Sequence, residues 1–218
     1  MRIIIVVTQF PPRHMGGTEL QAEKIAHQLA ERNHLVHVVT RHDEGLPYEE
    51  RVGKSLFIHR GRTPSLPIAS NLVGAIFNVL KVTLKTRFDI LLAYTLYPSG
   101  LAAVIAAKIF RKPIEVWGRG DDVYLEYGSL IKVIRLIALM SADIVLAQTD
   151  DMKKRFLKMW RHIRNLQIIP NAIDFKIFRE KREATSDTPI ITYVGGLRPV
   201  KGVQYLVEAF KAVIEEMP

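Results

Sequence analysis

Short apolar runs alternate with longer amphipathic segments through most of the chain, and this alternation predicts its secondary structure. Six short runs are typical of strands, at 3–8, 35–40, 89–93, 114–117, 143–147 and 166–169, and a less regular one lies near 56–59. Several of these runs are apolar at consecutive rather than alternating positions. That pattern is typical of strands buried on both faces of a parallel sheet.

Amphipathic stretches of helical length lie between these runs, near residues 18–31, 68–86, 99–110, 126–140 and 149–162. Alternating strands and helices predict βαβ units, in which helices cover both faces of the sheet. The expected fold class is therefore α/β, a Rossmann-like parallel sheet with helices on both faces.

The pattern changes after residue 169. Residues 170–188 are rich in charged and polar positions and predict a linker. An apolar run at 190–194 and an amphipathic stretch from about 201 to 217 then begin a second strand–helix series. Because one strand and one helix cannot enclose a core, we expect an N-terminal domain at 1–175, a linker at 176–188 and an incomplete second α/β unit at 189–218.

The amino-acid composition excludes several kinds of functional site. With 218 residues, of which 48% are hydrophobic and 24% charged, the chain is long enough to bury a full core. The absence of cysteine excludes disulfides, thiolate metal sites and cysteine nucleophiles. Neither a secretory signal nor a run of about 18 apolar residues is visible, so a cytoplasmic location is expected.

The net charge of +9 favours anionic partners. Residues 1–185 hold 28 Lys or Arg against 18 Asp or Glu, so the positive charge belongs to this part of the chain. Nucleotide phosphates and acidic lipid headgroups both fit this balance. Nucleic acid is not the expected partner, because aromatic residues do not interleave with the basic ones.

Peripheral membrane contact is an alternative raised by one basic segment. Residues 153–164 carry six basic residues and no acidic one, and Phe156, Trp160 and Ile163 are spaced along one helical face. Such a helix either lies in a membrane interface or packs its apolar face on the sheet. A second basic helix, with Lys81, Lys85 and Arg87 after an apolar stretch, keeps membrane contact open.

The first glycine-rich segment follows the first strand. Gly16 and Gly17 precede the helix near 18–31, where Thr18 and Gln21 fit a capping box. Uncovered N–H groups at the start of a helix form a site for an anion or a sugar hydroxyl. An ordinary loop between strand and helix fits equally well, and the third glycine of a dinucleotide-binding fingerprint is missing.

The second glycine-rich segment, Gly118-Arg119-Gly120-Asp121-Asp122, follows the strand at 114–117. Arg119 has the fork geometry that suits a phosphate, and Asp122 can accept hydrogen bonds from sugar hydroxyls. The alternative is a plain turn with an aspartate helix cap. Two adjacent acids without a third ligand are weak evidence for a metal, so no metal site is expected.

Six segments together resemble family 4 of the retaining glycosyltransferases, which are nucleotide-sugar enzymes with a GT-B fold. In chain order they are Phe10-Pro11-Pro12 with Gly16, Gly17 and Glu19; Phe88 to Tyr94 with Tyr97-Pro98; Arg119-Gly120-Asp121-Asp122; Ser141-Ala142-Asp143; Pro170-Asn171-Ala172-Ile173-Asp174 with Phe178; and Val194-Gly195-Gly196-Leu197 with Lys201-Gly202. The segments cover nearly the whole chain.

The resemblance implies transfer of a sugar from a nucleotide sugar to a hydroxyl of a glycan, lipid or small molecule. The protein's own cations, rather than a metal or cofactor, would neutralise the leaving diphosphate. The implied site residues are catalytic Arg119 and Asp122; substrate-binding Gly16, Gly17, Glu19, Tyr94, Asn171 and Asp174; and donor-phosphate-binding Lys201 and Arg198.

The sequence departs from the family pattern at several positions. Arg119 and Tyr94 stand where the family often has histidines, and Gly196 stands where it often has an arginine. The chain also reaches Pro218 after only one strand–helix pair of the second half. We therefore expect low activity from the chain as written, as a half-complete glycosyltransferase; the alternative is a truncated, non-enzymatic homologue that binds an anion, a membrane or a partner.

Overall fold

The computed structural model describes residues 1–62, 69–126, 128–173, 190–197 and 199–216. Two compact units divide the chain, Met1–Ile173 and Asp174–Pro218. The first unit contains the sheet, and the second contains Lys201.

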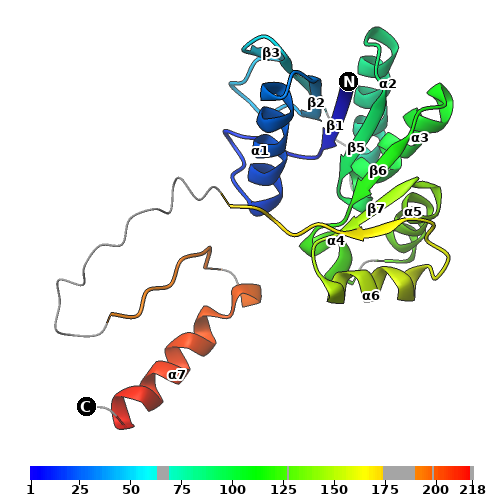
Figure 1. Ribbon diagram of the computed structural model, residues 1–218. Coiled ribbons are helices and arrows are strands. Elements are labelled where there is room, and N and C mark those ends of the chain that lie inside the picture. Colours follow the sequence, from blue (N-terminus) through cyan, green and yellow to red (C-terminus); the bar gives the residue numbers. More distant parts are fainter. Residues whose placement is uncertain (63–68, 127, 174–189, 198, 217–218) are drawn as a thin grey trace. The chain divides into compact units, whose positions relative to one another are not determined.

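An eight-stranded sheet forms the first unit, in the order β3-β4-β2-β1-β5-β6-β7-β8 (Figure 1). Its strands are β1 (Arg2–Val7), β2 (Leu35–Arg41), β3 (Glu49–Val52), β4 (Leu56–Gly61), β5 (Ile90–Tyr94), β6 (Ile114–Trp117), β7 (Ile144–Ala147) and β8 (Leu166–Ile168). Every neighbouring pair is parallel except β3 and β4. The predicted α/β, Rossmann-like fold class is confirmed.

The sheet reverses its direction of growth between β1 and β5. From β1 the chain builds outward through β2 and β4, and it then crosses to β5 on the other side of β1. Arg2 ties the amino ends of these strands by donating to Asp89 from its backbone nitrogen and its guanidinium, both at 2.7 Å. At the carboxyl ends, Thr8 Oγ1 and Ser99 Oγ lie 3.1 Å apart. Open α/β sheets bind ligands at the carboxyl edge beside such a reversal.

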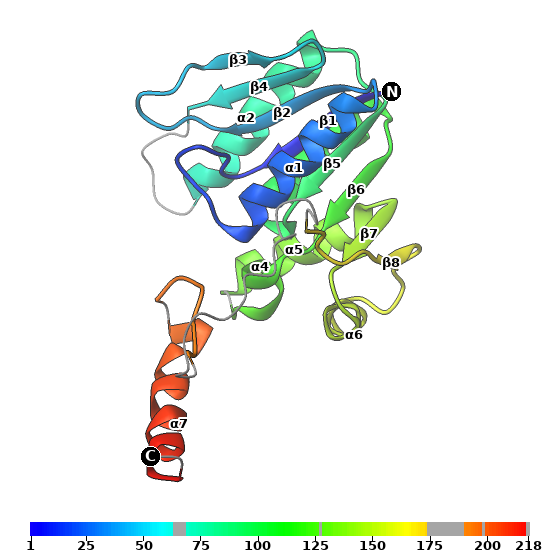
Figure 2. The ribbon, with the colours of Figure 1, turned by 60° about the vertical axis from the view of Figure 1, so that its left-hand side comes forward.

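Each face of the sheet buries its own set of side chains. Ile3 and Ile5 of β1 pack in one core with the helix α1 (Gly17–Glu31). Ile4 and Val6 pack in the other core, with a layer of four helices: α2 (Ala69–Lys85), α3 (Leu101–Phe110), α5 (Ser129–Ser141) and α6 (Asp150–Met159). Figure 2 shows α1 and α2 on opposite sides of the strands.

Several elements differ from the sequence prediction. A separate short helix, α4 (Gly120–Tyr124), precedes α5 because the backbone becomes extended at Leu125. β3 was not predicted, because its residues are polar and alternate only weakly. Helix α1 begins at Gly17, with Gly16 as its cap and no side-chain capping bond, so the predicted Thr18–Gln21 capping box is wrong.

The second unit contains less regular structure than expected. Its described residues form a 3-10 turn (Pro199–Lys201) and the helix α7 (Val203–Glu216). Residues 190–194 do not form the predicted strand. A strand is stabilised by pairing its N–H and C=O groups with a neighbour, and the described part of this unit supplies none.

The basic helix α6 packs its apolar face on the sheet. Phe156 is fully buried and Met152 nearly so. Thr149 caps the helix by accepting a hydrogen bond from Met152 N at 3.2 Å. The interpretation of 153–164 as an interfacial helix with its apolar face in a membrane is therefore wrong. Within the described ranges, no helix is both long and apolar enough to cross a bilayer.

His37 of β2 gives the sheet a predicted pH dependence. Burial, with the charge of His59 as a second cause, lowers the pKa of His37 from 6.5 to about 4. Between pH 6.5 and about 4, His37 is therefore protonated in the unfolded chain but neutral in the folded chain. The free energy of unfolding consequently falls as the pH drops through this range. A His37→Phe variant, whose ring can stack on Phe57 as the imidazole does, is expected to lose less stability over this range.

Urea unfolding of both proteins at about pH 7.5 and about pH 5 measures this difference. An equal loss of unfolding free energy in the two proteins on acidification would contradict the assignment.

Candidate functional site

Arg119 is the central charged residue at the carboxyl edge of the sheet. It comes two residues after the end of β6, and it caps α4. Gly118 precedes it, at a place where a Cβ would clash with the ring of Phe156. The guanidinium carbon lies 4.0 Å from the centre of the Trp117 ring and 4.5 Å from that of Tyr94. Arg119 is only 3% exposed, so the fold holds this cation out of water against two aromatic rings.

The hydrogen bonding of Arg119 is incomplete. Its Nη1 donates to Asn171 Oδ1 at 2.8 Å, and the same oxygen accepts from Gln148 Nε2 at 2.8 Å. Its Nε and Nη2 are buried and, like Tyr94 Oη and Trp117 Nε1, form no hydrogen bond of regular geometry among the described residues. The side chains of Arg119 and Tyr94 lie close enough for a weak hydrogen bond between them, which shifts the pKa of both. Each unsatisfied buried donor costs about 1–3 kcal/mol. Four such atoms in one cluster indicate a place suited to the oxygen atoms of a ligand.

The electrostatics of this cluster favour an acceptor of hydrogen bonds. Burial lowers the pKa of Arg119, and the charges of Tyr94, Asp122 and Glu19 oppose that effect. An arginine nevertheless remains protonated in proteins. Burial raises the pKa of Tyr94, which keeps its hydroxyl neutral. A ligand here would meet one fixed positive charge and neutral donors.

Asp122 has both carboxylate oxygens engaged by the backbone. Oδ1 accepts from Arg119 N at 2.7 Å, and Oδ2 accepts from Leu96 N at 2.5 Å. Burial raises the pKa of Asp122 to about 6, although these two bonds and the charge of Arg135 act in the opposite direction. The carboxylate therefore fixes the start of α4 to the end of β5. Its predicted catalytic role stays a prediction.

The turn after β5 is strained. Thr95 has φ 122° and ψ 154°, a backbone conformation that is essentially confined to glycine. Its amide donates to Trp117 O at 3.0 Å, and the bond from Leu96 N to Asp122 holds the next residue. Such strain persists only where the surroundings impose it. The imposed turn holds Tyr94 beneath the Arg119 guanidinium.

The start of α1 lies at the same edge of the sheet. A Cβ on Gly17 would meet no other atom within 4 Å, whereas a Cβ on Gly16 would clash with the carboxylate of Glu19. Gln21 Nε2 donates to Ala172 O at 2.9 Å, which ties this helix to the segment that follows β8. The open approach and the positive end of the helix dipole favour an anion at this position.

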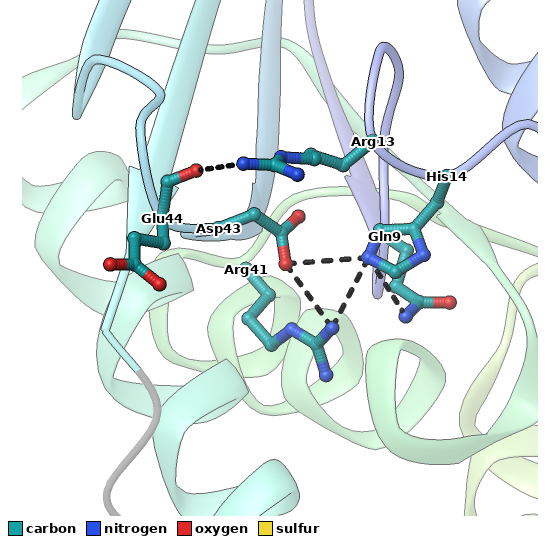
Figure 3. Close-up of polar contacts among 6 residues, drawn as sticks. All are labelled: Gln9, Arg13, His14, Arg41, Asp43 and Glu44. Atoms are coloured by element: carbon teal, nitrogen blue, oxygen red, sulfur yellow. Dashed lines mark hydrogen bonds and ion pairs between the residues drawn. The ribbon is translucent and has the colours of Figure 1, made fainter.

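A second polar cluster, which the sequence patterns did not reveal, lies at the carboxyl ends of β1 and β2 (Figure 3). His14 Nε2 lies 3.3 Å from each of Gln9 Nε2, Asp43 Oδ1 and Arg41 Nη2. Arg13 donates to a backbone oxygen of the loop after β2 at 3.1 Å. Strand β5 lies between β1 and β6, so this cluster and Arg119 occupy separate positions along the edge.

A hollow opens beside this second cluster. Its walls include Thr8 and Ser99 at the carboxyl ends of the central strands, Arg41 of β2, and Asn71 and Asn78 of α2. Valine and alanine side chains line most of the rest. The space inside is about 20 Å³, room for roughly one water molecule, so at most a small polar group enters it.

The predicted site residues of the first unit gather at one edge of the sheet; they are Gly16, Gly17, Glu19, Tyr94, Arg119, Asp122 and Asn171. Tyr94 is fully buried beneath Arg119. Asp174 and Arg198 lie outside the described residues, and Lys201 is exposed in the second unit. Contact of any of these residues with a substrate stays a prediction.

No group of three or more His, Asp or Glu side chains that could hold a metal ion occurs within the described part of the chain.

Comparisons with known proteins place this geometry in a family. A family model described as Glycosyltransferase Family 4 matches residues 15–176. N-acetyl-alpha-D-glucosaminyl L-malate synthase from Bacillus anthracis is 23% identical over 234 residues, which cover 100% of this chain and 60% of that protein.

Solved structures of lower identity share the fold. Sucrose-phosphate synthase from Thermosynechococcus elongatus has a TM-score of 0.68 at 15% identity, over 81% of this chain and 49% of its own. HepE from Anabaena, solved in complex with UDP-glucose, has a TM-score of 0.59 at 16% identity, over 82% of this chain and 46% of its own. The chain thus spans between about half and three-fifths of the length of these relatives.

Replacing Asp122 by alanine is expected to destabilise the first unit. The change leaves the backbone N–H groups of Arg119 and Leu96 buried without an acceptor, which costs about 2–4 kcal/mol of unfolding free energy. Asp150→Ala, in the exposed first turn of α6, is a matched control that should cost less than about 1 kcal/mol. Urea unfolding near pH 7 measures both, and a similar small loss in the two variants would contradict the positioning role of Asp122.

Proposed function

The chain belongs to Glycosyltransferase Family 4, and from this premise we propose that it takes part in transferring a sugar from a nucleotide sugar to a hydroxyl group of an acceptor. The whole protein's activity, substrates and partners are part of this proposal. A cytoplasmic location is proposed with it, since a chain without cysteine needs no oxidising compartment.

The observation that carries the proposal is the buried Arg119 with two unsatisfied donors at the carboxyl edge of the sheet. In the proposed reaction the bond between the sugar's anomeric carbon and the diphosphate oxygen breaks, and that oxygen keeps the electron pair. The acceptor oxygen bonds to the anomeric carbon and gives its proton to the departing diphosphate oxygen. The developing negative charge on the diphosphate is stabilised by cations and N–H donors placed beforehand.

Arg119 fits this demand for three reasons. Its charge is permanent, its stacking on Trp117 and Tyr94 fixes its plane, and its forked N–H groups match phosphate or paired sugar oxygens. The protein has already met the cost of desolvating this cation on folding. A ligand oxygen that satisfies Nε and Nη2 therefore gains binding energy without further reorganisation.

We assign the other residues of the carboxyl edge to binding of either the sugar donor or the acceptor. We assign the start of α1, with Gly16, Gly17 and Glu19, to phosphate or acceptor contacts, because its N–H groups attract anions and its carboxylate accepts hydroxyls. A small polar group of the acceptor is proposed to enter the hollow beside Arg41 and His14. Lys201 and Arg198 are the proposed donor-phosphate-binding residues, and in the proposed mechanism these two cations take the role that a metal plays elsewhere. Asp174, like Asn171, is proposed to bind substrate.

The first compounds to test come from the relatives. UDP-glucose occupies the HepE structure, and L-malate appears in the name of the Bacillus anthracis relative. Both are anionic, in keeping with the +9 charge of this chain.

The test is an assay of the 218-residue protein with UDP-, GDP- and ADP-linked sugars and a panel of acceptors, recording nucleoside diphosphate release and binding of each nucleotide sugar. Arg119→Ala is expected to lower binding or turnover by about a hundredfold or more, the range for losing a donor aimed at developing charge. Arg119→Lys should retain part of the function, because it keeps the charge but not the fork.

Arg32→Ala removes an exposed arginine from the end of α1 and serves as the matched control. Thermal unfolding checks that each variant folds. If no nucleotide sugar binds and none is consumed with any acceptor, the proposed function is refuted; binding without consumption would favour the non-enzymatic alternative. Equal activity of Arg119→Ala and the parent would instead remove Arg119 from the mechanism.

A further inference from the structure

Three of the four helices on one side of the sheet differ sharply in charge from α1 on the other side; the fourth, α6, carries Asp150 and Asp151. The helices α2, α3 and α5 contain no Asp or Glu, and their exposed lysines are Lys81, Lys85, Lys108 and Lys132. By contrast α1, on the opposite face, carries Glu19, Glu23 and Glu31 with a single lysine. Lys132 is paired with Glu126 at 2.8 Å, and the other three lysines have no ion pair among the described residues.

Large apolar side chains are exposed on the same helices. On α2, Phe77 is 66% exposed and Leu84 is 74% exposed, and on α5 Leu130 is 69% exposed. The full set on the three helices is Val73, Phe77, Leu84, Ile109, Leu130, Val133, Ile137 and Met140. No large apolar residue of α1 is exposed in this way.

These residues form stripes rather than isolated positions. Positions 73, 77 and 84 follow the spacing i, i+4, i+11, and positions 130, 133, 137 and 140 follow i, i+3, i+7, i+10, so each set lies along one side of its helix. Other sides of the same helices pack in the core, where α2 contributes Val79 and Val82 and α5 contributes Ala138 and Leu139. Each helix therefore has a second apolar side that the first unit does not use.

The three helices form one continuous layer. Helix α3 contacts both α2 and α5, and all three lie on the same side of the sheet (Figure 1). The outward side of this layer, defined by the eight exposed apolar residues and the four lysines above, is called the basic-apolar face. Arg87, Arg111 and Lys112 extend its positive charge just beyond the ends of α2 and α3, and all three are exposed.

We propose that the basic-apolar face docks on the surface of a membrane that contains anionic phospholipids. The apolar stripes would enter the boundary between headgroups and acyl chains, while the lysines contact lipid phosphates. Both requirements of interfacial binding, exposed apolar area and an excess of positive charge, occur on this face and not on α1; of its four lysines only Lys132 has an acidic partner, Glu126, among the described residues. The mode is peripheral, and it uses α2 and α5 in place of the apolar side of α6, which the sheet covers.

Charge favours a lipid surface over a second copy of the chain. A symmetric dimer through the basic-apolar face would oppose the same lysines across the interface, which costs energy when no acidic residue compensates them. An anionic bilayer supplies that compensation.

A vesicle flotation assay with the 218-residue protein tests the proposal. Vesicles of phosphatidylcholine alone are compared with vesicles that include about 30% phosphatidylglycerol. The protein is expected to float with the anionic vesicles and to be released as NaCl rises from about 0.1 M to about 0.5 M. Phe77→Ser with Leu84→Ser should weaken binding by about tenfold or more, since each removes several inserted carbon atoms.

A charge reversal and its control complete the design. Lys81→Glu with Lys85→Glu should also weaken binding by about tenfold or more. Lys24→Glu with Arg32→Glu makes the same change at exposed positions of α1 and should leave binding unaltered. All four altered apolar and lysine positions are exposed, so circular dichroism should report an unchanged fold.

Three results would overturn the proposal: no flotation with anionic vesicles, equal flotation with neutral ones, or unchanged flotation of the Phe77/Leu84 variant. A concentration-dependent dimer that this variant abolishes, without vesicle binding, would assign the face to a second copy instead. None of these results depends on nucleotide-sugar binding, so the membrane proposal and the proposed function can fail separately.

Discussion

A guanidinium taken out of water at the end of β6 determines the arrangement of the sheet's carboxyl edge. Burying a charge costs several kcal/mol unless neighbours replace its hydration. For Arg119 those neighbours are two aromatic rings, one amide oxygen and the nearby charges of Asp122 and Glu19. The replacement is partial, and the donors that remain without an acceptor support the proposed binding role of this edge.

Much of this arrangement could be predicted from the sequence, because it follows from local rules. Consecutive apolar positions identified the parallel strands, and glycine-rich segments directly after two of them located Gly16, Gly17 and Arg119 at the carboxyl edge. The parts that could not be predicted depend on distant contacts. The partner of Asp122 is Leu96, on another strand's end, and the cluster of Gln9, His14, Arg41 and Asp43 joins two loops with no shared motif. The strand expected at 190–194 depended on a neighbour, which periodicity within one segment cannot reveal.

The two faces of the sheet carry different chemistry on the same architecture. One side is covered by α1, whose surface is polar and carries three glutamates. On the other side α2, α3 and α5 contain no carboxylate, and only α6 carries two, Asp150 and Asp151. Because a fold of this kind hosts many functions, such surface differences are more informative about an individual protein than its topology. The carboxyl edge of the sheet, where ligand binding is proposed, joins these two faces.

The bond between Arg119 and Asn171 has a consequence for the path of the chain. Asn171 belongs to the segment that leaves β8, and Gln21 holds the next residue of that segment through Ala172 O. A ligand that accepted a hydrogen bond from Nη1 would displace Asn171 and weaken the attachment of the segment that follows β8. Because such coupling is reciprocal, any interaction that strengthens the attachment of this segment lowers the affinity for the ligand. Ligand binding at Arg119 and the mobility of the segment after β8 would thus be coupled.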